Sequence, residues 1–139
     1  MNTARGALLT DLNLDGKLDL VVVNRWVNAE IWRNTSTGLG HFMEFRLNQP
    51  EPNRDGIGAW LEVKRADGKV MRRELYSGGG HVSGALDWWH VGVGDLAKTE
   101  VRVLWPDGEQ GPWEALDSDA FYVLERGKPA RLWTPASTP

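Results

Sequence analysis

The sequence is divided into short apolar or β-branched runs, each of which ends at glycine, aspartate, asparagine or proline. No segment repeats apolar residues at the spacing that a sustained amphipathic helix needs. This pattern of short runs that end at turn-forming residues is typical of short strands joined by tight turns. The 16 glycines and eight tryptophans suit the same structure. The pattern predicts an all-β chain, with room for one helical turn around Gly94–Lys98. The expected strands are Ala7–Thr10, Leu18–Val23, Ala29–Arg33, His41–Leu47, Ala59–Arg65, Val70–Tyr76, Trp89–Val93, Glu100–Trp105, Phe121–Glu125 and Ala130–Trp133.

The clearest hairpin joins the fifth and sixth of these strands through a turn that contains Gly68. A two-residue loop would mix apolar and charged side chains on both faces of the hairpin. A three-residue loop with Gly68 in the left-handed bulge position separates them and places Glu62 opposite Arg72. This register leaves Arg73 on the apolar face, where its guanidinium must reach the sheet edge or pair with a carboxylate.

Charge and composition exclude several classes of protein. The 139 residues carry 16 basic and 19 acidic side chains, a net charge of −3, whereas a nucleic-acid-binding surface needs a basic stripe. Cysteine is absent, which excludes disulfides, iron–sulfur clusters and cysteine nucleophiles. The apolar runs are far too short to span a bilayer, so we expect neither a nucleic-acid partner nor membrane insertion.

One loop carries the residues of a metal site. Asp11, Asn13, Asp15 and Asp19 place side-chain oxygens at positions one, three, five and nine of this loop, with a glycine at position six. Calcium takes about six to eight hard oxygen ligands, and alternate residues of a tight loop can supply them. The main-chain carbonyl of Lys17 is a further candidate ligand. The sequence therefore predicts a calcium site.

The residues around this loop distinguish it from an EF-hand. An EF-hand needs a bidentate glutamate at position twelve and helices on both sides, whereas position twelve here is Val22 and both flanks are strand-like. Magnesium fits less well because it dehydrates reluctantly and prefers few carboxylates. A hairpin turn rich in Asp and Asn that holds no metal is the alternative left open.

The segment around the loop resembles an FG-GAP or VCBS repeat, the calcium-loop blade unit of integrin-like β-propellers. The resemblance covers roughly residues 7–34, including Asp19–Asn24 and Ile31–Asn34. It implies a blade hairpin stabilised by calcium. Because a propeller typically needs about four to eight blades, it also implies that the remainder of the propeller is a partner of this segment.

The rest of the chain, from about His41 to Glu125, resembles the ASPIC/UnbV domain, which follows such propellers in the cartilage-acidic-protein-like family. The resemblance rests on the motifs Asn53–Ala59, Arg73-Glu74, Ser77–Gly80, His90–Gly94 and Trp105–Gly108. It implies a family role for Arg73, Glu74, Gly78, Gly80, His90, Trp105, Asp107 and Gly108. The chain departs from the family pattern at His81 and at Ser83-Gly84, where the family has an aromatic residue and Ser-Gln.

Together these observations predict three segments. Residues 1–40 are expected to form an isolated propeller-type blade hairpin, residues 41–133 an antiparallel β-sandwich or small barrel, and residues 134–139 a disordered tail. No signal peptide is visible, and the resemblance implies a piece of a longer secreted chain in an extracellular or cell-envelope location. The predicted function is a non-catalytic, calcium-stabilised interaction or adhesion module for a protein or glycan partner on a cell surface or matrix.

Two other functions compete with this interpretation. Trp88 and Trp89 cannot both point inward from one strand, so at least one could offer a flat platform to a sugar ring. The chain would then be a carbohydrate-binding module. The ASPIC/UnbV resemblance also implies, as a further alternative, an accessory role in enediyne-type natural-product biosynthesis.

No arrangement of residues predicts catalysis. The histidines His41, His81 and His90 are not at metal-ligand spacing. Ser77, Ser83 and His90 include the residue types of an acyl-transfer site, but the sequence contains no nucleophile elbow. We therefore assign no catalytic residue.

Overall fold

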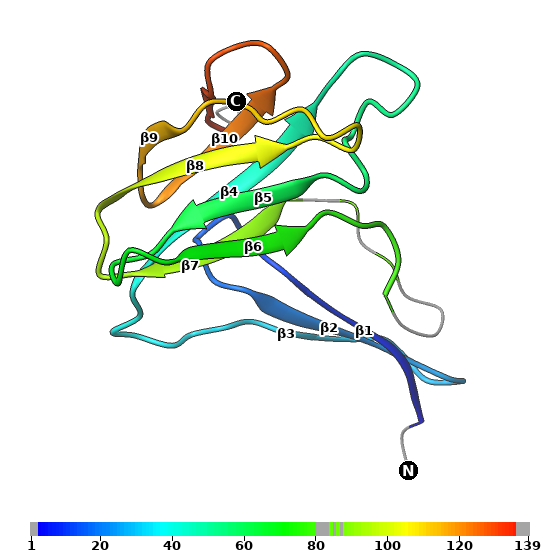
Figure 1. The fold of residues 1–139 in the computed structure, drawn as a ribbon. Helices are drawn as coiled ribbons and strands as arrows, with labels where there is room; N and C mark the ends of the chain where they lie inside the picture. The colour runs from blue at the N-terminus through cyan, green and yellow to red at the C-terminus, as the bar shows by residue number, and fades with distance from the viewer. Residues whose placement is uncertain (1–2, 80–83, 85, 87, 136–139) are drawn as a thin grey trace.

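The computed structural model describes residues 3–79, 84, 86 and 88–135, and every regular element in this part of the chain is a β-strand (Figure 1). The all-β prediction is confirmed. The strands are β1 (Ala4–Thr10), β2 (Asp19–Asn24), β3 (Glu30–Trp32), β4 (His41–Asn48), β5 (Trp60–Lys64), β6 (Val70–Glu74), β7 (Trp89–Gly94), β8 (Lys98–Leu104), β9 (Glu114–Asp117), β10 (Ala120–Glu125) and β11 (Arg131–Trp133).

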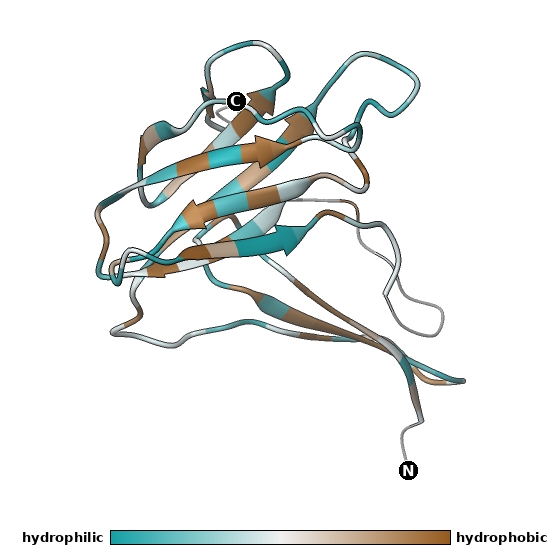
Figure 2. Cartoon of the chain, viewed as in Figure 1, coloured by the Kyte–Doolittle hydropathy of each residue, from teal (hydrophilic) through white to brown (hydrophobic). Residues whose placement is uncertain are grey.

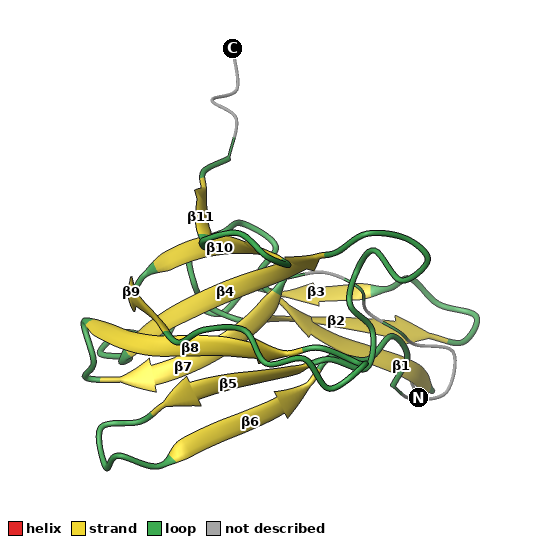
Figure 3. Cartoon of the chain, turned by 45° about the horizontal axis from the view of Figure 1, so that its top comes forward, coloured by secondary structure: helices red, strands yellow, loops and turns green. Residues whose placement is uncertain are grey.

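The described strands form three sheets. β1, β2 and β3 form an antiparallel meander, here called the N-terminal sheet. The first sandwich sheet has the strand order β11-β10-β4-β7, and the second has the order β6-β5-β8-β9. The two four-stranded sheets lie face to face, whereas most of the N-terminal sheet extends away from them (Figures 1 and 3).

The hydrophobic core lies between the two sandwich sheets. Side chains alternate between the faces of a strand, and β4 buries Met43, Phe45 and Leu47 in this way. In the second sheet, β5 and β8 alternate apolar and polar residues, which Figure 2 shows as successive brown and teal bands. The core consists of Met43, Phe45, Leu47, Ala59, Leu61, Val63, Leu75, Trp89, Val91, Val101, Val103, Trp105, Tyr122 and Leu124. This packing is that of a β-sandwich, as expected.

One strand pair of the sandwich is parallel. β10 runs parallel to β4, with Tyr122 opposite Phe45, while all the other pairs of the three sheets are antiparallel. The antiparallel sandwich expected from the sequence does not include this parallel pair. A parallel pair needs a long crossover, and here the chain between β4 and β10 builds the whole second sheet and β7.

The β5–β6 hairpin has the predicted register. Arg65 N–H donates to Lys69 O at 2.8 Å, and Glu62 lies opposite Arg72. Arg73 is exposed, and its guanidinium reaches the sheet edge, where Nη1 donates to His90 O of β7 at 2.6 Å. The sequence left open whether Arg73 reaches the edge or pairs with a carboxylate, and the structure shows the first.

The ten expected strands are all present, with ends displaced by up to three residues. The additional strand is β9, a four-residue edge strand that carries charges at both ends. No helix occurs in the described residues around Gly94–Lys98, where Leu96 N–H instead makes a turn contact to Val93 O at 3.5 Å. Most of the tail predicted at 134–139 lies outside the described residues.

Candidate functional site

The oxygen-rich loop connects β1 to β2, and Asp11 organises its first half. Asp15 N–H donates to Asp11 Oδ1 at 3.1 Å, and Gly16 N–H donates to Asp11 Oδ2 at 2.6 Å. The backbone turns back on itself at Leu14 and Gly16, whose φ angles are 59° and 81°. Glycine accepts such a φ at little cost. The loop therefore encloses the Asp11 carboxylate, and the residue is only 6% exposed.

Asp19 ties the loop to the third strand. Leu12 N–H donates to Asp19 Oδ2 at 3.2 Å, and Asn34 N–H donates to Asp19 Oδ1 at 2.8 Å. Asn34 follows β3, and its side-chain amide donates to Leu18 O at 3.3 Å. Asp19, which is 2% exposed, thus joins the loop to the chain after β3.

Asp15 is the most accessible of the three aspartates. Its carboxylate accepts hydrogen bonds from the Asn13 side chain at 2.9 Å and from Lys17 N–H at 3.1 Å. Arg33 lies 3.4 Å from the same carboxylate. The hydrogen bond from Asn13, assisted by Lys17 and Arg33, holds the pKa of Asp15 below its ordinary value.

The residues present fit calcium by their chemistry. All the predicted ligands, the Lys17 carbonyl included, are oxygen donors, which hard cations prefer. Among the described residues, neither Asp11 nor Asp19 pairs with a cationic side chain, although a buried carboxylate normally needs such a partner or a metal. The carboxylates are turned toward loop amides, and in the described part of the chain no three acidic or histidine side chains converge as a metal cluster. The calcium site therefore stays a prediction.

The loop packs against the outer face of the first sandwich sheet through Gly16. A Cβ added to Gly16 would stand 2.0 Å from the ring of Phe42 on β4, so only glycine fits this contact. Gly16 O accepts a hydrogen bond from Nε2 of His90 on β7 at 2.9 Å, and the His90 and Phe42 rings are stacked. Burial lowers the pKa of His90, which favours the neutral imidazole that this contact uses.

A cleft of about 780 Å³ opens between the loop and the sandwich. At its rim His41 Nδ1 lies 2.7 Å from Asp119 Oδ2, and Phe42 N–H donates to Asp119 Oδ1 at 3.3 Å. Asp119 was not singled out from the sequence. The Ser-Asp turn before β10 was the available signal, because aspartate tolerates the positive φ of 57° found there.

Trp88 and Trp89 point to opposite faces, as expected, but neither forms an open platform. Trp89 lies in the core and contacts Tyr76 edge-on. Trp88 is half-buried on the outer face, where its ring packs against Phe121 and Trp133 at centroid distances of 5.3 and 4.8 Å. The proposed sugar platform is wrong for Trp89, because the core covers it, and the ring of Trp88 is already packed against two aromatic neighbours.

The residues singled out by the ASPIC/UnbV resemblance do not form one site. Arg73 and His90 meet at the junction of β6 and β7, with the Arg73 guanidinium 5.4 Å from the ring of Trp89. Glu74 is exposed at the end of β6. Gly78 has a φ of 120°, and Gly80 lies outside the described residues, as do His81 and Ser83.

The Trp105–Gly108 motif forms the predicted β-turn directly after β8, at the same end of the second sheet as Glu74. Gly108 N–H donates to Trp105 O at 2.8 Å, and Gly108 has a φ of 91°. The Asp107 carboxylate pairs with Arg126, and this hydrogen bond holds the pKa of Asp107 below its ordinary value. Arg126 was missed from the sequence, because nothing local relates it to a turn 19 residues earlier.

The comparisons identify the family. A family model described as ASPIC and UnbV matches residues 49–131, which is more than half of the chain. The chain therefore belongs to the ASPIC and UnbV family. The comparison with curated proteins found no match, and the comparison with solved structures found none either. The FG-GAP or VCBS resemblance of residues 7–34 lies outside this match and stays a prediction.

The contact between Gly16 and Phe42 predicts a specific loss of stability. Gly16→Ala adds a Cβ that collides with Phe42 at a backbone position with positive φ, and we expect it to destabilise the fold by more than about 1 kcal/mol. Gly68→Ala is the matched control, because Gly68 has a φ of 77° with nothing within 4 Å of an added Cβ. Urea denaturation measures both variants, and equal losses of stability would contradict the docking contact.

Proposed function

We propose that this chain is a non-catalytic interaction module whose N-terminal sheet is one blade of a larger β-propeller. The observation that carries the proposal is the apolar character of both faces of this sheet. One cross-strand row consists of Leu9, Leu20 and Trp32, and the adjacent row, on the opposite face, consists of Leu8, Val21 and Ile31. Figure 2 shows β2 brown over most of its length.

A sheet that is apolar on both faces needs cover on both sides. In this chain the cover is incomplete, because Leu9 is 60% exposed, Trp32 is 60% exposed on the same face, and Ile31 on the other face is 68% exposed. Exposed apolar surface of this kind marks a contact with another protein surface. The neighbouring blades that the FG-GAP or VCBS resemblance implies are the occupant that fits such a two-faced sheet.

Calcium would stabilise this blade at its loop. Asp11, Asp15 and Asp19, with Asn13 and the Lys17 carbonyl, would hold the ion, which would supply the positive charge that the two buried aspartates lack. The loop would then present Gly16 to the first sandwich sheet in a fixed orientation. The sandwich and the blade would then form one rigid unit that binds a protein or glycan partner on a cell surface or matrix.

The same proposal places the protein outside the cell or in the cell envelope and gives it no catalytic role. An extracellular or cell-envelope site provides calcium at concentrations that weak loop sites need. Among the described residues there is no helix that could cross a membrane. His90 uses Nε2 to bind Gly16 O, and this contact gives it a structural role in place of the acyl-transfer role considered above.

Calcium binding predicts a reversible gain in stability. We expect the melting temperature to rise with millimolar calcium and to fall again with EDTA, with a gain of about 2.7 kcal/mol at a hundredfold excess over Kd. Asp15→Asn should abolish the response without unfolding the protein, because Asp15 is partly exposed. Asp67→Asn, in an exposed turn, is the control, and this variant should keep the calcium-dependent rise in melting temperature. Identical melting curves in calcium and EDTA would contradict the calcium site but not the docking face.

The exposed faces of the blade predict self-association when other blades are not there to cover them. In sedimentation velocity we expect the sedimentation coefficient to rise with protein concentration. The variant Leu9→Lys/Ile31→Lys, which charges both faces, should stay monomeric with an unchanged melting temperature. A large loss of stability in this variant would show that the chain itself covers these side chains, and the interaction proposal would then be wrong.

A further inference from the structure

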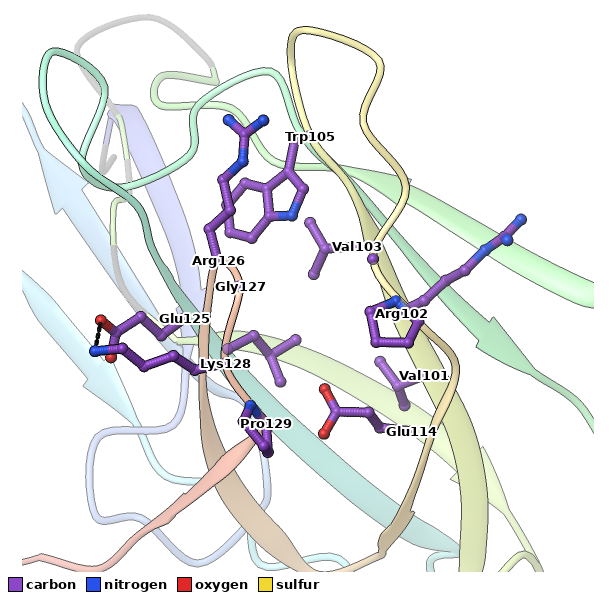
Figure 4. A pocket seen from close by; sticks show the side chains of 13 residues that line it. Val101, Arg102, Val103, Trp105, Glu114, Glu125, Arg126, Gly127, Lys128 and Pro129 are labelled. Carbon is purple, nitrogen blue, oxygen red and sulfur yellow. Dashed lines mark hydrogen bonds and ion pairs between the residues drawn. The ribbon is translucent and has the colours of Figure 1, made fainter.

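A cavity of about 320 Å³ lies between the two sandwich sheets, on the side where their edge strands are short (Figure 4). β9 pairs with β8 only as far as Val101, and β11 pairs with β10 only over Phe121–Val123. Beyond Val101, β8 is contacted only by the loop before β9, through an isolated bridge between Leu104 and Gln110 and a hydrogen bond from Gly111 N–H to Val103 O. The buried side chains of Val101, Val103 and Leu124 therefore line a space that is accessible from outside.

The lining of this cavity is mainly apolar. Its walls include Pro112 and Pro129, which have no backbone N–H to satisfy, and Gly111 and Gly127, which have no side chain to fill the opening. The volume lies near the lower end of the range for small-molecule sites, about 300–1,000 Å³. The cavity has the size and character of a site for a small, mostly apolar molecule.

Trp105 supplies an unpaired hydrogen-bond donor to this cavity. Trp105 as a whole is 4% exposed, and Cζ3 of its six-membered ring stands beside Gly56, at 3.4 Å from a Cβ added there. Arg126 covers the ring at 5.5 Å. The opposite edge, which carries Nε1, points into the cavity (Figure 4). No acceptor in the described part of the chain pairs with Nε1, which is therefore free to donate to a molecule in the cavity.

Glu114 supplies an acceptor at the other end. Its Oε2 accepts a hydrogen bond from Ala130 N–H at 2.7 Å, which links the two sheets. Its other oxygen meets no donor among the described residues. Figure 4 shows this carboxylate directed into the cavity below Trp105. The cavity therefore holds one donor and one acceptor on an apolar background.

The basic side chains at the rim are already engaged in ion pairs. Each one pairs with an acidic side chain, so none is available to bind an anionic ligand. The pairs are Arg102–Glu62, Arg126–Asp107, Arg126–Glu109 and Lys128–Glu125. This arrangement selects against phosphates and carboxylates and favours a ligand that carries no negative charge.

We propose that this cavity is a binding site for a small, mainly apolar molecule with a hydrogen-bond acceptor at one end and a donor at the other. A carbonyl or ether oxygen of the ligand accepts from Trp105 Nε1–H. A hydroxyl or amide group of the ligand donates to Glu114. The site is independent of the calcium loop and of the N-terminal sheet, which lie at the outer face of the first sandwich sheet.

The test uses 4-hydroxyacetophenone as the probe, because it carries a ketone and a phenol at opposite ends of an apolar ring. Titration of the ¹⁵N-labelled protein should shift the Trp105 indole N–H resonance saturably. Acetophenone, which lacks the donor, and p-cresol, which lacks the ketone, should each bind roughly fivefold more weakly, the equivalent of one hydrogen bond of about 1 kcal/mol.

Two variants decide whether the probe binds in the cavity. Pro112→Phe places a ring at the exposed mouth and should abolish binding, while Val70→Phe, on exposed β6 outside the cavity, should leave it unchanged. Trp105→Phe, followed through the backbone amide of Val103 in the cavity wall, should weaken binding roughly fivefold, and circular dichroism checks that it folds. The proposal would be overturned by the lack of any saturable shift at about 10 mM probe, or by Pro112→Phe binding the probe as tightly as the unaltered protein.

Discussion

Two buried carboxylates, Asp11 and Asp19, hold the N-terminal part of the chain in place. Asp11 gathers the loop amides, and Asp19 joins the loop to the chain after β3. Their hydrogen bonds present Gly16 to Phe42 and His90, which is how the N-terminal sheet contacts the sandwich. Two enclosed negative charges without a cationic side chain among the described residues are costly, and a bound cation would offset this cost.

Local patterns predicted most of the fold. The strands follow from alternation along the chain, the β5–β6 register from a glycine that accepts positive φ, and the Trp105–Gly108 turn from a proline whose ring fixes a negative φ. The oxygen-rich loop was found for the same reason. Its residues lie within nine positions of one another, so their spacing alone indicates their chemistry.

Features that depend on distant residues could not be predicted in this way. Three such features join residues far apart in the chain. They are the parallel β4–β10 pair, the contact between Asp119 and His41, and the ion pair of Arg126 with the Trp105–Gly108 turn. Alternation showed that Trp88 and Trp89 face opposite ways. It could not show that Trp133 and Phe121 pack against Trp88, because these partners come from β10 and β11.

The molecule offers two surfaces of different kinds. The N-terminal sheet exposes flat apolar faces that suit another sheet, whereas the sandwich encloses a small cavity with one donor and one acceptor. The ASPIC and UnbV family match covers residues 49–131, which belong to the sandwich and not to the N-terminal sheet. Our two proposals assign different partners to the N-terminal sheet and to the sandwich, which contact each other through the loop at Gly16.

Residue-resolved hydrogen exchange in calcium and in EDTA tests most directly whether the loop depends on a cation. If a cation holds the loop, calcium should slow exchange at the amides of Leu12, Gly16 and Asn34, which donate to the aspartates, and should leave the amides of β5 and β8 unchanged. Exchange at these three amides that is the same with and without calcium would contradict the calcium site.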